Sequence, residues 1–323
     1  MTAPTTTTIN VTDAIKQALT EEMRRDARVV SFGEGVATRY QDLVQEFGPL
    51  RIRNTPLAEG IIAGTAAGAA ATGLRPVIDL LFTPFICYAM EELVNSAGKL
   101  RYISGGQFSF PLVATAWTGS GFTVGAQHNH NIEAWFVHSP GLKVVMPSNP
   151  ADFKGLLKAA IRDDNPVMYF IDMPLLFQEG EVPEGDHVVP IGQAATVRRG
   201  TDVTFVTYAK MVHTCLQAAE TLAEGGVSAE VIDLRSLKPW DEGAVLASAT
   251  KTGRVVVVHE ASRTCGMGAE IAATIGERVF GELKGPVVRI AGPDTPPPSS
   301  YALEQAFLPQ PDAIVAAAKK LLG

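Results

Sequence analysis

A single carboxylate opens the most unusual apolar run of this chain. Glu59 follows RIRNTPLA and begins EGIIAGTAAGAAATG, where Gly60, Gly64 and Gly68 recur at every fourth residue. On a helix this spacing puts the glycines on one face, so we expect tight helix packing there, as at a subunit interface. Glu59 itself has two interpretations. It is a first-turn charge favoured by the helix dipole, or a buried carboxylate that exchanges a proton with a ligand's ring nitrogen.

A second polar cluster lies in the segment GSGFTVGAQHNHNIEAWF. Its glycine-rich approach leads to Gln127, His128, Asn129 and His130. The two histidines would share a face only on a strand, and no carboxylate or thiol at regular ligand spacing completes a metal site. A loop histidine that donates a proton is the more plausible chemistry. The alternative, a hydrogen-bonded histidine in a polar loop, is equally compatible with the residues.

The sequence contains no motif for holding a phosphate group. It lacks G-x-x-x-x-G-K-[ST], a G-x-G-x-x-G between a strand and a helix, and a Gly-Asp-Gly that would hold magnesium. It also lacks the G-x-S-x-G turn of a nucleophilic serine. Any ligand of Glu59 and the histidines therefore needs an anion anchor from elsewhere.

Composition narrows the class of protein. The 323 residues are 46% hydrophobic and 19% charged, with a formal net charge of −7, which argues against nucleic acid or an anionic membrane as partner. We expect no secretory signal and no membrane span, since the apolar helix at 60–73 is too short for one. Three cysteines without a C-x-x-C pair are typical of a reducing compartment, so we predict a cytoplasmic protein.

Apolar runs of strand length alternate with helical patterns along the chain. The runs lie at 28–33, 74–82, 110–116, 142–147 and 167–172, with helices predicted from Val11, where Thr12 could cap the first turn, and from Pro150. The alternation restarts beyond a Gly- and Pro-containing linker. We predict an α/β protein of two domains, each a mostly parallel sheet covered by helices. The expected divisions are a disordered leader at 1–8, a first domain at 9–175, a linker at 176–190 and a second domain at 191–323.

Four segments together resemble a known family. They are NTPLAEGIIAGTAAG, VNSAGKLRYISGGQ, VGAQHNHNIEAWFVHSPGLKVVMPSNP and SAEVIDLRSLKPWD. From about residue 9 onward the chain resembles the beta subunit of the thiamine-diphosphate-dependent decarboxylating component of 2-oxo acid dehydrogenase complexes, of the pyruvate, branched-chain or acetoin type, in the transketolase-like superfamily. The resemblance implies a pyrimidine-binding domain followed by a transketolase C-terminal-like domain.

The resemblance implies roles for five side chains. Glu59 would hydrogen-bond N1′ of the cofactor's aminopyrimidine, and Phe85 would lie beside that ring, with Leu57 and Tyr88 at neighbouring pocket positions. His128 would stabilise intermediates and donate a proton as the acyl group passes to a lipoyl arm. The implied reaction is oxidative decarboxylation of a small 2-oxo acid, or cleavage of acetoin.

Partners and ions are implied in the same way. An alpha subunit would hold magnesium and the diphosphate within an α2β2 heterotetramer, and a lipoyl-bearing acyltransferase core would accept the acyl group. Some relatives also hold a structural potassium ion through oxygen ligands. The matching positions here are Leu112, Ala160, Ile161, Asp163 and Asn165, and their alternative interpretation is a capped helix end at RDDN.

This chain departs from the family pattern around the expected substrate approach. The stretch after Gly35 is several residues shorter than in most relatives, and QHNH stands where relatives usually read QHSQ. Tyr88 and Glu92 also replace other residues. We therefore keep a second function, the C-terminal half of a split transketolase-like transferase, although QH followed by EAWF and the SGGQ segment favour the dehydrogenase. A third interpretation, a subunit serving only assembly, is disfavoured because both Glu59 and His128 are present.

Overall fold

The first half of the chain folds around a seven-stranded sheet. The computed structural model describes residues 5–323, and within them the strand order is β12-β6-β7-β5-β4-β2-β3. Every neighbouring pair in this sheet is parallel except β12 with β6. The strands are β2 (Val29–Gly33), β3 (Ile52–Asn54), β4 (Arg75–Phe82), β5 (Val113–Thr118), β6 (Lys143–Val145), β7 (Val167–Asp172) and β12 (Ser236–Lys238).

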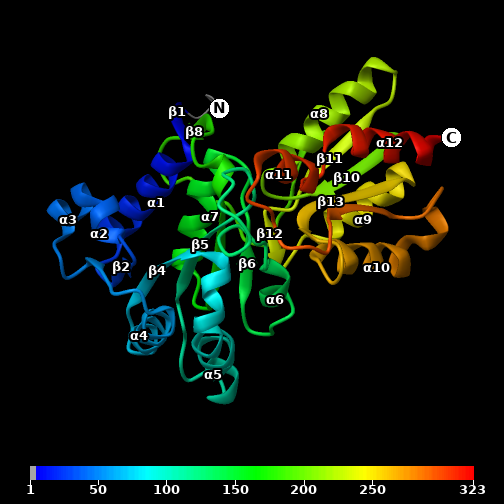
Figure 1. Cartoon of the computed structure of the whole chain (residues 1–323). Coiled ribbons are helices and arrows are strands. Elements are labelled where there is room, and N and C mark those ends of the chain that lie inside the picture. Colours follow the sequence, from blue (N-terminus) through cyan, green and yellow to red (C-terminus); the bar gives the residue numbers. More distant parts are fainter. Residues whose placement is uncertain (1–4) are drawn as a thin grey trace.

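Helices cover both faces of this sheet, as its apolar strands require (Figure 1). Strand β7, with the sequence VMYFID, is buried at every residue, which is typical of a parallel strand with helices on both sides. One face packs against α1 (Val11–Arg25) and α7 (Pro150–Arg162). The other packs against α4 (Glu59–Ala71) and the short helix η1 (Thr83–Ala89). Each of the five apolar runs predicted as strands overlaps a strand of this sheet; the run at 110–116 begins three residues before β5 and ends two residues before the strand does.

The second half repeats the arrangement on a smaller scale. Its five-stranded sheet has the order β14-β13-β10-β11-β9, parallel except for the edge strand β9. Helices α8 (Met211–Glu224) and α12 (Pro311–Leu322) cover one face, while α9 (Glu242–Thr252) and α10 (Met267–Val279) cover the other. The strands are β9 (Ala195–Arg198), β10 (Val203–Thr207), β11 (Ala229–Asp233), β13 (Val255–Ser262) and β14 (Val288–Gly292). Two α/β sheets covered by helices are thus present, as predicted.

Between residues 5 and 323, no helix is both long and apolar enough to cross a membrane.

Shorter elements connect the layers of the two sheets. The remaining elements are β1 (Thr6–Asn10), α2 (Val36–Arg39), α3 (Gln41–Phe47), η2 (Glu91–Ala97), α5 (Gly98–Ile103), α6 (Glu133–Val137), η3 (Met173–Leu175), β8 (Glu179–Pro183), η4 (Phe280–Glu282) and α11 (Tyr301–Phe307).

The predicted disordered leader is wrong for its last residues. Strand β1 pairs antiparallel with β8, which lies in the predicted linker, and Thr8 is opposite Glu181. Residues 1–4 lie outside the described part of the chain. The cap of α1 also differs from the prediction: the Asn10 side chain accepts the Asp13 N–H at 2.8 Å, whereas the Thr12 hydroxyl donates to the Leu176 carbonyl. The pairing of β1 and the bond of the Thr12 hydroxyl each involve a partner about 165 to 175 residues away, whereas the Asn10 cap is a local contact.

The two halves are joined through the sheet itself. Strand β12 comes from the second half of the chain, yet it completes the edge of the first sheet against β6. The Met146 N–H donates to the Arg235 carbonyl at 2.8 Å beside this pair. The seven-stranded sheet is therefore incomplete without a segment from the second half of the chain.

A buried charged cluster lies where the halves meet. The Lys210 ammonium pairs with Glu260 and contacts the Ser120 carbonyl, and the Lys210 backbone N–H donates to Asp172 at 3.2 Å. Burial lowers the pKa of Lys210, but the two carboxylates more than offset this, and the pKa is raised overall. Burial raises the pKa of Asp172. The cluster stays paired only while both halves of the chain are in place.

Nearby, Glu133 accepts a hydrogen bond from the Tyr208 hydroxyl at 2.7 Å, and its second oxygen is buried without a partner among the residues described. Burial raises the pKa of Glu133 to about 7. Below about pH 4.5 this carboxyl is protonated in both the folded and the unfolded chain, so its burial as a charged group does not lower the free energy of unfolding. Between about pH 4.5 and 7 only the unfolded chain loses the proton, which lowers the free energy of unfolding as the pH rises.

Replacing Glu133 with Gln should remove this pH-dependent loss of stability, because the amide cannot ionise. Its oxygen can still accept the hydrogen bond from the Tyr208 hydroxyl. We expect the variant to be more stable than the natural chain at pH 8 by roughly 3 kcal/mol, a shift of about 2.5 pKa units at 1.36 kcal/mol each, and to show little gain at pH 4. Urea unfolding at the two pH values measures this. The exposed Glu91→Gln is the matched control and should show no gain at either pH. Equal gains for Glu133→Gln at both pH values would contradict the burial argument.

Candidate active site

Helix η1 brings most of the predicted site residues together. It follows β4 through a turn at Leu81, which has a φ of 60° and whose N–H donates to the Asp79 side chain at 2.8 Å. At its other end η1 meets the first turn of α4. A Cβ built on Gly60 would lie 2.8 Å from the Tyr88 carbonyl oxygen, so this contact requires glycine. Glu59, the first residue of α4, is thereby held beside Tyr88.

Glu59 has no hydrogen bond or ion pair to any residue between 5 and 323. Its side chain is partly exposed, and it lies on a surface where Leu57 is 68% and Tyr88 78% exposed. Helix α4 begins at Glu59, so the carboxylate lies in a first helical turn, a position that both interpretations share. This chain does not by itself enclose the carboxylate, so the expected burial requires another molecule. An unpaired carboxylate flanked by two large apolar side chains is suited to a ligand with an apolar ring and a protonatable nitrogen.

His128 lies among aromatic rings rather than among polar groups. Its ring is edge-on to Phe82, with centroids 4.9 Å apart, and to Phe85, at 5.3 Å. The ring makes no hydrogen bond to another described residue, which removes support from the interpretation as a hydrogen-bonded loop histidine. Phe85 of η1 and His128 are therefore neighbours, and η1 links them to Tyr88 and Glu59. For His130, by contrast, burial lowers the pKa, and its ring lies edge-on to Trp135.

The loop that carries His128 is fixed from the second half of the chain. The Glu304 carboxylate on α11 is fully buried and accepts the Thr123 N–H and the Asn129 side-chain amide, each at 3.2 Å. At the start of the loop, the Ser120 N–H donates to Glu260 at 2.6 Å. The residue at 129, where this chain departs from its relatives, thus contacts α11. Sequence reasoning missed Glu304, since nothing local connects it with a loop about 175 residues earlier.

Glu92 borders the glycine face of α4. A Cβ on Gly64 would lie 3.3 Å from its Cγ, and one on Gly60 would lie 3.6 Å from its Oε1. The other carboxylate oxygen of Glu92 is buried and has no partner among the described residues. This side chain borders a mainly apolar groove of about 410 Å³ between α4 and the η2–α5 segment. A second unpaired carboxylate therefore lies within one helical turn of Glu59.

The positions predicted for potassium lie at the end of α7 and beside it. Arg75 donates to the carbonyls of Ile161 and Asp163 at 3.0 and 3.1 Å, and Arg101 donates to the Asn165 side-chain oxygen at 2.8 Å. Backbone N–H groups donate to the carbonyls of the other two positions. Asp163 caps α7, which confirms the alternative of a capped helix end. Each of these oxygens accepts a hydrogen bond from the protein, and potassium binding stays a prediction. The five positions are Leu112, Ala160, Ile161, Asp163 and Asn165.

No other metal site is formed by side chains in the described part of the chain. Groups of three or more His, Cys, Asp or Glu that could hold an ion do not occur between residues 5 and 323.

Comparison with known proteins accounts for nearly the whole chain. Residues 7–177 match the family described as Transketolase, pyrimidine binding domain, and residues 192–314 match Transketolase, C-terminal domain. The chain is 41% identical to the acetoin:2,6-dichlorophenolindophenol oxidoreductase subunit beta of Bacillus subtilis (strain 168), over 98% of this chain and 97% of that protein. It is 43% identical to the pyruvate dehydrogenase E1 component subunit beta of Porphyra purpurea, over 96% of each chain.

The chain belongs to this family of beta subunits. A third member, the 2-oxoisovalerate dehydrogenase subunit beta of the same Bacillus subtilis strain, is 43% identical over 96% of this chain and 97% of its own length. The resemblance inferred from the four sequence segments is confirmed. Among solved structures, a split-gene transketolase, described as an inactive beta4 tetramer, aligns with a TM-score of 0.81 at 27% identity, over 97% of this chain and 98% of that one. The transketolase-like fold is thereby confirmed as well.

The contact between α11 and the site loop gives a prediction within this beta-subunit family. Replacing Glu304 with Ala leaves the Thr123 N–H and the Asn129 amide without their buried acceptor, which costs about 1 to 3 kcal/mol for each unsatisfied group. We expect amide hydrogen exchange across 119–131 to speed up at least tenfold, while β7 keeps its protection. Leu303→Ala, at the exposed neighbouring position, is the control. Unchanged exchange in the loop would show that Glu304 does not hold it.

Proposed function

We propose that this chain is the beta subunit of a thiamine-diphosphate-dependent decarboxylating component of a 2-oxo acid dehydrogenase complex. The observation that carries the proposal is the grouping of Glu59, Tyr88, Phe85 and His128 along η1, with the Glu59 carboxylate unpaired among residues 5–323. The named relatives act on pyruvate, 2-oxoisovalerate or acetoin, and the substrate proposed here is a small 2-oxo acid or acetoin. The cytoplasm is the compartment we propose for it.

Each side chain has a distinct task in this proposal. Glu59 accepts and returns a proton at N1′ of the aminopyrimidine, for which its lack of a protein partner leaves it free. Phe85, Leu57 and Tyr88 provide apolar surface beside that ring. His128, held by two aromatic edges and a fixed loop, donates a proton as the acyl group leaves for a lipoyl arm. Bound thiamine diphosphate supplies the electron sink for decarboxylation.

A partner is needed to complete the site. We propose an alpha subunit that holds the magnesium ion and diphosphate, in an α2β2 assembly that passes the acyl group to a lipoyl-bearing acyltransferase. The exposed Leu57 and Tyr88 and the groove beside the glycine face support this, because an apolar surface next to a catalytic carboxylate is costly to leave in water. The absence of any phosphate motif in the chain agrees with it.

The split transketolase is the weaker alternative. It shares the fold, but at 27% identity, whereas the dehydrogenase and oxidoreductase beta subunits reach 41–43% over nearly the whole chain. Fold alone does not distinguish the two activities. Release of carbon dioxide from a 2-oxo acid, in contrast to transfer of a two-carbon unit between sugar phosphates, would separate them.

Activity should require both subunits, and Glu59 should be essential within the pair. We expect the purified chain alone to release no carbon dioxide, and co-expression with its alpha subunit to restore release from a 2-oxo acid. In that assembly Glu59→Gln should lower kcat at least a hundredfold, since the amide cannot take up the proton, while the heterotetramer still forms by size-exclusion chromatography. The exposed Glu91→Gln should retain full activity. Turnover by the chain alone would contradict the divided site.

His128 should matter more for transfer than for decarboxylation. In the same assembly, His128→Ala is expected to slow reductive acylation of a lipoyl domain at least tenfold more than it slows decarboxylation with an artificial electron acceptor, because only the transfer step needs its proton. Comparing the two assays on one preparation measures this. His138→Ala, on the far side of α6, is the control. Equal losses in both assays would argue against a role in transfer.

A further inference from the structure

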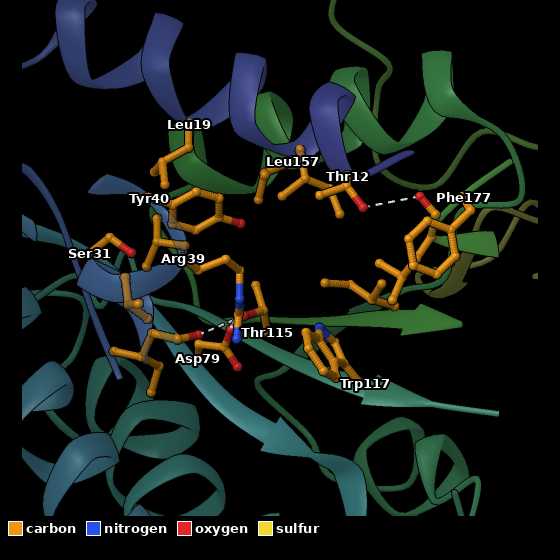
Figure 2. Close-up of a pocket in the computed structure, with 16 residues that line it drawn as sticks. Thr12, Leu19, Ser31, Arg39, Tyr40, Asp79, Thr115, Trp117, Leu157 and Phe177 are labelled. Atoms are coloured by element: carbon orange, nitrogen blue, oxygen red, sulfur yellow. Dashed lines mark hydrogen bonds and ion pairs between the residues drawn. The ribbon is translucent and has the colours of Figure 1, made fainter. Parts of the chain in front are cut away.

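A cavity of about 300 Å³ lies on the α1 and α7 face of the first sheet, away from α4 (Figure 2). Apolar side chains from both helices, including Ile15 and Leu157, form its roof, and β4 and β5 form its floor. Its volume lies at the lower end of the range for small-molecule sites, about 300 to 1,000 Å³. Helix α2, a single turn of four residues, contributes Val36 and Arg39 to the lining.

Arg39 gives the cavity one specific polar group. Its guanidinium pairs with Asp79 and lies over the Trp117 ring, 4.8 Å from the centroid. The Arg39 side chain is still 25% exposed, and Figure 2 shows it reaching across the cavity floor. Among the described residues, the one hydrogen bond that its guanidinium donates goes to Asp79 through Nη1. Several guanidinium N–H groups therefore remain available to an oxygen of a ligand.

The charge of Asp79 is already compensated. One of its oxygens accepts from Arg39 and the other accepts the Leu81 N–H. The cavity thus offers donors on a cation and no free anionic acceptor. A carboxylate forms charge-assisted hydrogen bonds with a guanidinium, which are about twice as strong as those from a neutral oxygen. Around it, the aliphatic walls and the Trp117 and Phe177 rings favour a compact apolar body.

The same residues connect the cavity to His128. Trp117 lines the cavity and packs edge-on against Phe82, with centroids 5.8 Å apart, and Phe82 packs against His128 at 4.9 Å. Asp79 also fixes the left-handed turn at Leu81 that leads into Phe82. A ligand that contacts Arg39 and Trp117 can therefore act on the Phe82 ring by two routes. One is the direct contact of Trp117 with Phe82, and the other is the Arg39–Asp79 pair, since Asp79 holds the turn at Leu81.

We propose that this cavity binds a small monocarboxylate with a branched aliphatic or aromatic body, its carboxylate on Arg39, and that occupancy is transmitted through Trp117 and Phe82 to His128. The binding claim is independent of the proposed function. Only its significance, control of the acyl-transfer residue by a carboxylate, rests on that function. For this reason the test uses binding and spectroscopy of the full chain and not turnover.

The probes are 4-methylpentanoate and phenylacetate, with the neutral 4-methylpentan-1-ol as the matched control for the head group. In isothermal titration calorimetry we expect each carboxylate to bind the full chain at one equivalent with a submillimolar Kd, and the alcohol to bind at least tenfold more weakly. No saturable binding, which is the result expected of a dry apolar cavity, would overturn the proposal. Equal binding of the alcohol would overturn the part assigned to Arg39.

Three variants locate the site. Ile15→Phe fills the cavity and should abolish binding, while Ile15→Leu keeps the volume and should bind as the natural chain does. The double variant Arg39→Met with Asp79→Asn removes both charges, keeps an oxygen for the Leu81 N–H, and should weaken carboxylate binding at least tenfold. Near-ultraviolet circular dichroism shows whether each variant is folded. Undiminished binding in folded Ile15→Phe would place the ligand elsewhere and refute the proposal.

A final measurement tests the connection to the active site. The ring resonance of His128, assigned by its loss in His128→Gln, should shift on addition of 4-methylpentanoate and follow the calorimetric Kd. In Trp117→Leu the carboxylate should still bind, though more weakly, while the shift is lost. Saturable binding without any shift of this resonance in the natural chain would overturn the transmission to His128 and leave the binding site standing.

Discussion

Lys210 carries a charge that has almost no access to water, and its surroundings determine how the two halves of the chain meet. Its ammonium group pairs with Glu260 of β13 and reaches the Ser120 carbonyl, while its backbone N–H holds Asp172 at the end of β7. A buried charge without such partners would cost several kcal/mol, so the partners must arrive together. Ser120 begins the loop that ends at His128, and its N–H is bound by the same Glu260. The position of His128 thus depends on contacts made by the second sheet. A substitution in either half that breaks these contacts would move the loop that carries it.

The site differs from this cluster in being open. The Lys210 ammonium has its counter-charge inside the chain, in Glu260. Among residues 5–323, by contrast, Glu59 has no partner, one buried oxygen of Glu92 has none, and Leu57 and Tyr88 near Glu59 are exposed. The chain therefore pairs one charge internally and leaves the Glu59 carboxylate open to another molecule. The division of labour with an alpha subunit follows from this contrast, and the family relationship agrees with it.

The periodic parts of the fold were accessible from the sequence alone. Buried parallel strands such as VMYFID and amphipathic helices such as α1 and α7 carry their own pattern, and all were predicted close to their observed positions. Pairings between distant segments carry no such pattern, and so β1 with β8, β12 with β6, and Glu304 with Asn129 were not foreseen. For the site, residue types left Glu59 and the histidine each with two interpretations. The family motifs chose between them, and the structure adds that η1 connects the chosen residues, while their catalytic roles stay predictions.

The second half of the chain contributes β12 to the first sheet, and this has a consequence for folding during synthesis. Until residues 236–238 leave the ribosome, the first sheet ends at β6 with an open row of N–H and C=O groups, although its other strands are already available. Open strand edges recruit strands from other molecules, so the nascent first half is exposed to aggregation for the time needed to translate the roughly 65 residues between the end of β7 and the end of β12. A chaperone or rapid arrival of the second half has to protect that edge, and a proteolytic cut between the halves would expose it again only if the C-terminal piece then dissociated.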